Sequence, residues 1–210
     1  MRQKIIDAAL YMSRTGLVRG TSGNISARSQ NGFYITPSGM AYETLVESDI
    51  VEISLDGKIL TGTRKPSIEN AMHRLILQKR HDVNAVVHVH SLYATAVACT
   101  RKNIPAVTDN LVAYFGGEIP CAKYARAGSL ELAQNVSNAL GDGYGVLLSN
   151  HGALCVGATL REALLRCEVL EETAKIYILS NLIGKAVALS DEQIETEFAE
   201  MGRKYGQVGD

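Results

Sequence analysis

A short run of β-branched residues interrupted by two histidines, Val86-Val87-His88-Val89-His90, restricts the fold of this chain more than any other part of its sequence. Valine favours an extended backbone, so we expect a buried strand over about 85–90. Side chains two residues apart on a strand point to the same face, and the two imidazoles are therefore expected to converge. Ser91 can then cap a helix that continues to about Cys99.

The segments around this run alternate between helical and extended patterns. Residues 3–14 have the spacing of a short helix, and from Ile25 to Leu60 short apolar segments alternate with turn residues, which predicts strands joined by hairpins. Further helices are predicted over 68–80, 129–140 and after the capping pairs Thr159/Glu162 and Ser190/Gln193, and further strands over 117–121 and 145–149. This order indicates a layered α/β domain with a mixed sheet.

Length and composition favour one domain and narrow the range of partners. The chain has 210 residues, of which 46% are hydrophobic, so residues 1–210 are expected to form a single domain. Lys and Arg number 21 against 22 for Asp and Glu, which leaves no positive field to attract nucleic acid. No run approaches the roughly 18 uncharged apolar residues of a membrane span. Four scattered cysteines without a Cys-x-x-Cys pair indicate a reducing compartment, and we expect a cytoplasmic protein.

The histidines of the valine run also suggest a metal site. A buried neutral imidazole needs a partner for each nitrogen, and one divalent metal ion can satisfy two such rings. A third histidine, His151, follows directly after the strand predicted to end at Ser149, in the kind of loop that often carries functional groups. Three histidines with an open fourth position are typical of catalytic zinc, so His88, His90 and His151 are candidate ligands of Zn²⁺.

One carboxylate and two further histidines lie on or just after the helix predicted over 68–80. Glu69 is at the start of this helix, where the helix dipole favours a carboxylate for structural reasons alone. Beside a metal ion and shielded from water, the same group could accept and return a proton, provided that its pKa is raised toward neutrality. The residues alone leave both interpretations open. We interpret His73 and His81 as packing or surface residues, with a supporting role behind the metal as the alternative for His73.

Two glycine-containing loops in the first third of the chain can hold an anion without added positive charge. They are Gly20-Thr21-Ser22-Gly23-Asn24 and Thr36-Pro37-Ser38-Gly39, and both expose backbone N–H groups and hydroxyls. Each is also a common turn sequence, and neither has the lysine or the glycine spacing of a nucleotide-binding loop. The loops therefore allow phosphate binding and do not indicate a nucleotide.

Together these motifs resemble those of the class II aldolase/adducin family, in particular its short members that act on ketose 1-phosphates. The resemblance covers nearly the whole chain. The motifs that carry it are Thr21-Ser22-Gly23-Asn24, Ile35-Thr36-Pro37-Ser38-Gly39, Pro66-Ser67-Ile68-Glu69, His88-Val89-His90 and Asn150-His151-Gly152. No single motif is specific, but their order and spacing together are.

This resemblance implies a fold, an assembly and a set of site residues. The implied fold is a three-layer α/β/α arrangement with a central mixed, largely antiparallel sheet, in a homotetramer with active sites at subunit interfaces. His88, His90 and His151 would bind Zn²⁺ as a Lewis acid for a small-molecule sugar phosphate, with Glu69 as the catalytic acid/base. The positions that would hold the substrate phosphate are Gly23, Asn24, Ser38, Gly39 and Ser67. Tyr205 matches a C-terminal tyrosine of the family that shapes aldehyde binding.

The implied reaction is cleavage of a (deoxy)ketose 1-phosphate, such as L-fuculose 1-phosphate, to dihydroxyacetone phosphate and an aldehyde. The alternatives within the family are a 5-deoxyribulose-1-phosphate aldolase, a 5-methylthioribulose-1-phosphate dehydratase, and a non-catalytic binding domain like that of adducin. Epimerisation of ribulose 5-phosphate is disfavoured, because the aspartate that it needs would fall near Ala113.

Two positions depart from the pattern of the family. Asn110 stands where a catalytic tyrosine is expected to protonate the aldehyde oxygen, and Tyr114 is four residues away. Ile68 replaces the second serine of the phosphate site. Both departures bear mainly on which aldehyde is used, leave the choice of reaction open, and do not alter the metal centre.

Overall fold

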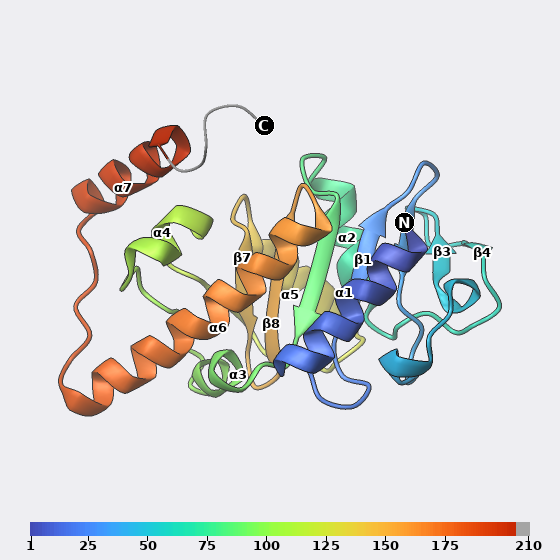
Figure 1. Ribbon diagram of the computed structural model, residues 1–210, viewed down its shortest axis with the longest axis horizontal. Helices are drawn as coiled ribbons and strands as arrows, with labels where there is room; N and C mark the ends of the chain where they lie inside the picture. The colour runs from blue at the N-terminus through green and yellow to red at the C-terminus, as the bar shows by residue number, and fades with distance from the viewer. Residues whose placement is uncertain (205–210) are drawn as a thin grey trace.

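The fold is built on an eight-stranded sheet (Figure 1). The computed structural model of the chain describes residues 1–204. In chain order the strands are β1 (Asn24–Arg28), β2 (Phe33–Ile35), β3 (Val51–Ile53), β4 (Ile59–Thr61), β5 (Ala85–Val89), β6 (Cys121–Ala122), β7 (Gly145–Leu148) and β8 (Gly152–Gly157). Across the sheet their order is β4-β3-β2-β1-β5-β8-β7-β6, and all neighbours are antiparallel except β6 with β7. The expected mixed, largely antiparallel sheet is confirmed.

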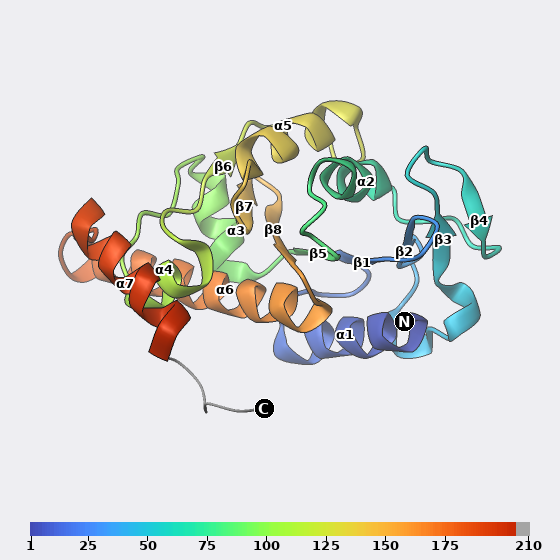
Figure 2. The same cartoon turned by 90° about the horizontal axis from the view of Figure 1, so that it is seen from above.

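Helices cover both faces of this sheet. The α-helices are α1 (Arg2–Thr15), α2 (Asn70–Lys79), α3 (Leu92–Cys99), α4 (Asp109–Phe115), α5 (Leu130–Leu140), α6 (Leu160–Ile183) and α7 (Asp191–Lys204), the last of which packs against α4. Figure 2 shows α1 and α6 on one face and α2 and α5 on the other, which confirms the three-layer α/β/α arrangement. Within the described part of the chain, no helix is both long enough and apolar enough to cross a membrane.

Alternation along β5 decides which side chains face each helical layer. Val87 and Val89 are buried in the core that includes α1 and α6, whereas Val86 is buried with Met72 of α2. Successive side chains of a strand point to opposite faces, so His88 shares the face of Val86 and looks toward α2. The strand thus supplies both cores and carries an imidazole into the layer beneath α2.

Helix starts agree with the sequence at most positions. Ser129 and Thr159 accept hydrogen bonds from backbone N–H groups three residues further on, as capping residues do. Ser91 precedes α3 as expected, but its hydroxyl makes no capping bond. Instead, the carboxylate of Glu171 on α6 accepts hydrogen bonds from the backbone N–H groups of Tyr93 and Ala94, at 2.9 and 2.8 Å.

Three details differ from the expectations drawn from the sequence. The strand expected over 117–121 is reduced to β6, because Ile119 pairs with Ile104 in an isolated bridge and only Cys121 and Ala122 pair with β7. β8 was not predicted, because all six of its residues are buried and its sequence shows no alternation. The helix α4 was also not predicted, because its seven residues are too few to show a helical period.

Candidate functional site

Three histidines that are far apart in the sequence meet at one end of the central strands. His88 lies near the end of β5, His90 follows that strand, and His151 lies in the turn between β7 and β8. The register that pairs Val89 with Ala153 brings this turn beside the end of β5. Ring centroids are 4.7 to 4.8 Å apart, and the rings meet edge to face at 65° to 89°. Their ligand nitrogens lie within 4.8 Å of one another.

The hydrogen bond of His88 turns its lone pair toward the other two rings. Its Nδ1–H donates to the backbone carbonyl of Ala153 at 2.9 Å, which leaves Nε2 unprotonated in the neutral ring. This Nε2 lies 2.9 Å from Nε2 of His90. Burial lowers the pKa of His88 to about 4, against the opposing effect of the Glu69 carboxylate. Burial also lowers the pKa of His90. Both rings are therefore neutral near pH 7, as metal ligands must be.

Glu69 completes the cluster from the start of α2. Its Oε2 is 3.3 Å from Nε2 of His88, and its Oε1 is 3.5 Å from Nε2 of His151. The side chain is buried, and Oε1 has no hydrogen-bond partner within the described part of the chain. A buried carboxylate oxygen without a partner is strongly unfavourable unless a cation neutralises it. Three imidazole nitrogens beside such an oxygen fit a divalent metal ion, and nitrogen-rich sites of this kind favour zinc.

The pKa of Glu69 shifts in the direction opposite to the one expected from the sequence. Burial raises it and is the largest single effect, but the imidazole of His88, a hydrogen bond from the Asn24 amide, and the imidazoles of His151 and His73 together lower it by more. The net shift is below the usual value, so the group is a carboxylate near neutral pH. It is accordingly in the form required of a base before substrate binds.

A polar pocket of about 280 Å³ opens beside these groups. It is lined by all the positions expected to hold phosphate, namely Gly23, Asn24, Ser38, Gly39 and Ser67, together with Thr21, Ser22, Pro37, Ile68, Glu69, His90, Ala127 and His151. Among the residues that the structure describes, no lysine or arginine lines this pocket. Donors for an anion would therefore come from backbone N–H groups and hydroxyls.

Local pairing explains how the loops come to share one pocket. Pro37 and Pro66 form an isolated bridge, and the Ser38 N–H donates to the Lys65 carbonyl at 2.9 Å. The Ser67 N–H donates to the Thr36 carbonyl at 3.1 Å. These bonds hold the loop at 36–39 against the segment that leads into α2.

Tyr42 anchors the other loop and was not identified from the sequence. Its hydroxyl donates to the backbone carbonyls of Ser22 and Gly23, at 3.1 and 2.8 Å, and burial raises its pKa. Gly23 has a φ of 75°, and a Cβ there would lie 2.7 Å from the carbonyl oxygen of His88. Glycine is therefore required at this close approach to the metal-site strand.

The remaining candidates have different environments. His73, interpreted as packing or surface, is fully buried and hydrogen-bonded to polar side chains, while His81 is exposed. Asn110 is exposed on α4, and Tyr114 is half-buried on the same helix. Tyr205 lies outside the described residues.

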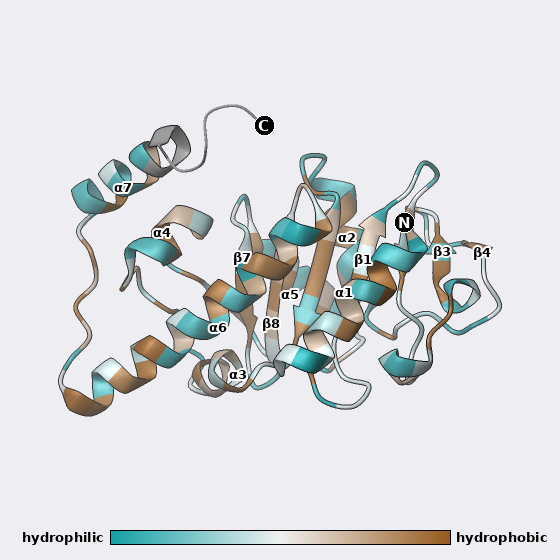
Figure 3. Ribbon diagram, viewed as in Figure 1, coloured by the Kyte–Doolittle hydropathy of each residue, from teal (hydrophilic) through white to brown (hydrophobic). Residues whose placement is uncertain are grey.

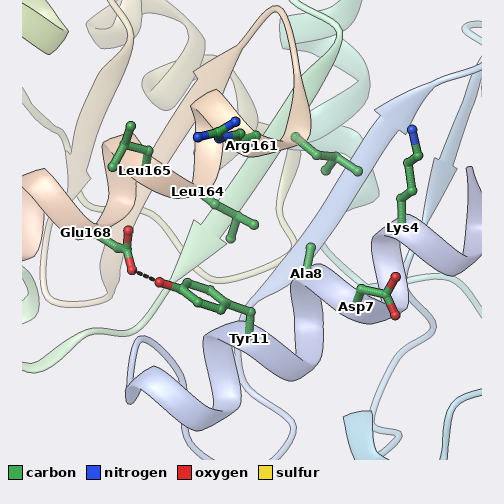
Figure 4. A pocket seen from close by; sticks show the side chains of 9 residues that line it. Lys4, Asp7, Ala8, Tyr11, Arg161, Leu164, Leu165 and Glu168 are labelled. Atoms are coloured by element: carbon green, nitrogen blue, oxygen red, sulfur yellow. Dashed lines mark hydrogen bonds between the residues drawn. The ribbon is translucent and has the colours of Figure 1, made fainter. Parts of the chain in front are cut away.

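A larger cavity of about 570 Å³ lies between α1 and α6 (Figure 4). Its polar lining includes Lys4, Asp7 and Arg161, all exposed, and the Tyr11 hydroxyl donates a hydrogen bond to Glu168 across it. None of the clustered histidines lines this cavity. The smaller pocket is therefore the candidate active site.

Comparison with known proteins identifies the class to which this fold and site belong. Residues 3–178 match the model of the Class II Aldolase and Adducin N-terminal domain family, and the chain belongs to this family. It is 42% identical over 195 residues to the L-fuculose phosphate aldolase of Escherichia coli (strain K12). The aligned region covers 92% of this chain and 90% of that protein.

Two further similarities extend over nearly the whole chain. A 5-deoxy-D-ribulose 1-phosphate aldolase of Bacillus thuringiensis serovar kurstaki is 36% identical over 208 residues, covering 98% of this chain and 97% of that protein. A solved structure of an L-fuculose 1-phosphate aldolase superposes with a TM-score of 0.93 at 36% identity, covering 96% and 95% of the two chains. The resemblance inferred from the sequence motifs is confirmed.

Gly152 tests the packing that places the histidines. A Cβ at this position would lie 2.3 Å from the Val89 carbonyl oxygen and 3.3 Å from Cε1 of His88. We expect Gly152→Ala to force β5 away from β8, to lower zinc affinity about tenfold or more, and to destabilise the metal-free protein by about 1–3 kcal/mol. Chelator competition and urea unfolding measure the two effects.

Gly184→Ala is the matched control, because the nearest atom to a Cβ there is 4.0 Å away and the backbone is extended. It should leave zinc affinity and stability unchanged. Zinc affinity at the wild-type level in Gly152→Ala would contradict the close packing described above.

Proposed function

We propose that this chain is a zinc-dependent aldolase that cleaves a (deoxy)ketose 1-phosphate, such as L-fuculose 1-phosphate, to dihydroxyacetone phosphate and an aldehyde. The observation that carries the proposal is the buried Glu69 carboxylate, with one unpartnered oxygen, beside three convergent imidazoles at the edge of an anion-sized pocket. Such an arrangement is expensive for a fold to maintain, and it suits a site that holds a cation and moves a proton. This argues against an adducin-like domain without catalysis.

In this proposal the imidazoles of His88, His90 and His151 hold the zinc ion. When bound, zinc supplies Lewis-acid stabilisation of the negative charge that develops on the ketose carbonyl oxygen. Neutral rings are needed for this role, and the lowered pKa values of His88 and His90 support it.

The pocket loops position the phosphate of the substrate. We assign this role to Gly23, Asn24, Ser38, Gly39 and Ser67, which line the pocket together. Gly23 and Gly39 have positive φ values of 75° and 68°, so their backbone can turn N–H groups toward an anion without steric conflict. A phosphate held there leaves the sugar carbons beside Glu69, which lines the same pocket.

Glu69 moves the proton on the carbon that joins the two product fragments. In the cleavage direction the ionised Glu69 takes the proton of the hydroxyl on the carbon that becomes the aldehyde, the carbon–carbon bond breaks, and Glu69 gives this proton to the carbon of the three-carbon fragment. In the synthetic direction Glu69 removes the proton from that carbon, the carbon attacks the aldehyde, and the proton passes to the aldehyde oxygen. Because its pKa is lowered, Glu69 is ionised near neutral pH and can accept the proton in synthesis, but it is a weaker base than a carboxylate of raised pKa would be.

We relate the identity of the aldehyde to the side of the pocket that Ile68 lines. Ile68, which is 63% exposed, presents an apolar surface where the family pattern has a serine. The related aldolases act on L-fuculose phosphate and on 5-deoxy-D-ribulose 1-phosphate, and both leave a short aldehyde with a terminal methyl group. We therefore favour substrates of this kind, and treat 5-deoxyribulose 1-phosphate as the second candidate.

A panel of ketose 1-phosphates tests the reaction. Purified zinc-loaded protein should release dihydroxyacetone phosphate from L-fuculose 1-phosphate or 5-deoxyribulose 1-phosphate, as detected by a coupled reduction of that product. Water loss from 5-methylthioribulose 1-phosphate without release of an aldehyde would instead identify a dehydratase. The absence of product from every member would overturn the proposed function.

Replacement of Glu69 separates proton transfer from metal binding. We expect Glu69→Gln to keep about one zinc ion per chain and to lower kcat by about 10²–10⁴, because the amide preserves the shape of the side chain but cannot accept the proton. Metal analysis and steady-state kinetics measure the two quantities. A variant with zinc bound and unchanged turnover would refute the role assigned to Glu69.

We also propose that the chain forms a single domain and assembles as a homotetramer with active sites at subunit interfaces. One sheet carries both cores, which supports the single domain. Support for assembly comes from the end of α6 and the segment after it, which are strongly apolar (Figure 3). Leu182, Ile183 and Val187 are 76%, 91% and 83% exposed. A cytoplasmic location agrees with the four free cysteines.

Light scattering tests the assembly. The wild-type protein should have roughly four times the 22.7 kDa mass of the chain. Replacing both Leu182 and Ile183 by Glu should lower that mass, because charged groups are unfavourable in an apolar interface. A monomeric wild-type protein at micromolar concentration would refute the tetramer.

A further inference from the structure

A chain of hydrogen bonds extends behind Glu69 into the layer between β1 and α2. The Asn24 amide nitrogen donates to Oε2 of Glu69 at 2.9 Å. The Asn24 amide oxygen lies 2.5 Å from Nε2 of His73, and Nδ1 of His73 lies 2.7 Å from the hydroxyl of Ser26. All four residues are at least 95% buried. No other part of the proposed reaction accounts for this arrangement.

The direction of every bond in this chain follows from the carboxylate at its end. An ionised carboxylate only accepts, so the Asn24 NH₂ group must face Glu69 and its carbonyl oxygen must face His73. That oxygen also only accepts, so His73 carries its proton on Nε2. Nδ1 of His73 is then an acceptor, and Ser26 donates to it. One arrangement of protons is consistent with every hydrogen bond in this series.

The spacing of the residues shows why β1 and α2 both contribute to this series of hydrogen bonds. Asn24 and Ser26 are two positions apart on β1 and point to the same face of the sheet. Glu69 and His73 are one helical turn apart at the start of α2. The layer contact between strand and helix is therefore polar here, although its surroundings, such as Met72, Ile76 and Val86, are apolar.

This arrangement makes the two oxygens of Glu69 unequal. Oε2 accepts from Asn24, whereas Oε1 has no partner and faces His151 at 3.5 Å. We propose that His73 is a positioning residue that locks the Asn24 amide through its Nε2–H, so that Oε2 stays bound and Oε1 is the oxygen that carries the proton. The catalytic part of this inference rests on the proposed function. The order of the hydrogen bonds does not depend on that function.

The protonation of His73 can be observed without any turnover. Two-bond ¹H–¹⁵N correlation spectra of labelled protein should show His73 as a neutral ring protonated on Nε2, both without metal and with zinc bound. The lowered pKa of this ring, about 3 because of burial, keeps it neutral over the working pH range. Protonation on Nδ1, or a mixture of both tautomers, would overturn the inference because Asn24 would then lack a fixed orientation.

Matched variants of His73 test the effect on catalysis. Gln at this position can place an N–H near that of Nε2, whereas Leu fills similar space without a donor. We expect His73→Leu to lower kcat by about 10–100-fold with KM and zinc content unchanged, and His73→Gln to retain most of the activity. Exchange of the dihydroxyacetone phosphate proton with D₂O should fall in parallel, because it reports the Glu69 step alone.

Controls separate this inference from the proposed function and from misfolding. His81→Leu changes an exposed histidine just after the same helix and should behave as wild type. Equal losses in His73→Gln and His73→Leu, or unchanged kcat in both, would refute the positioning role. If His73→Leu fails to fold, the tautomer of His73 in the wild-type protein decides the question, and Ser26→Ala should keep the proton on Nε2 because the Asn24 carbonyl alone requires it. A wild-type protein that cleaves no ketose phosphate refutes the proposed function but leaves the tautomer result valid.

Discussion

The antiparallel pairing of β5 with β8 is the interaction on which the candidate site depends. It joins residues from the middle of the chain to the turn that follows β7, over the register from Ala85↔Gly157 to Val89↔Ala153. The same pairing supplies the Ala153 carbonyl that fixes the proton of His88. A shift of β5 by one residue in this register would turn His88 to the opposite face of the sheet and put an aliphatic side chain in its place. The ladder therefore determines both the core and the position of the imidazoles.

Hydrogen-bond direction links this ladder to the rest of the polar layer. His88 and Asn24 each donate to a group that only accepts: a backbone carbonyl for His88 and a carboxylate for Asn24. Such groups leave little freedom to rotate or exchange protons. The resulting rigidity is what a catalytic carboxylate needs if its free oxygen is to remain in one place.

Much of the architecture could be predicted from the sequence, because its signals are local. The valine run predicts β5, and capping residues such as Ser129 and Thr159 predict where long helices begin. β8 could not be found this way because it is buried on both faces. The cap of α3 also could not, because Glu171 comes from a helix some 80 positions away in sequence.

The candidate site shows the same limit. Motif order suggested which residues belong together, and the structure brings His88, His90, His151 and Glu69 into one cluster. The direction in which the pKa of Glu69 shifts could not be predicted, since it depends in part on a hydrogen bond that the Asn24 amide donates from β1. Likewise, His73 is one helical turn from Glu69 in the sequence, but only the contact with β1 gives it a partner.

The pocket's lack of lysine and arginine has a kinetic meaning. Without cationic side chains at its mouth, and with a chain of net charge −1, the protein has no strong field to draw in anions from a distance. Recognition must then act only at contact range, through the geometry of hydroxyls and backbone N–H groups. Entry and departure of phosphorylated compounds should consequently depend little on ionic strength, and abundant polyanions such as nucleic acids gain no electrostatic advantage in occupying the site.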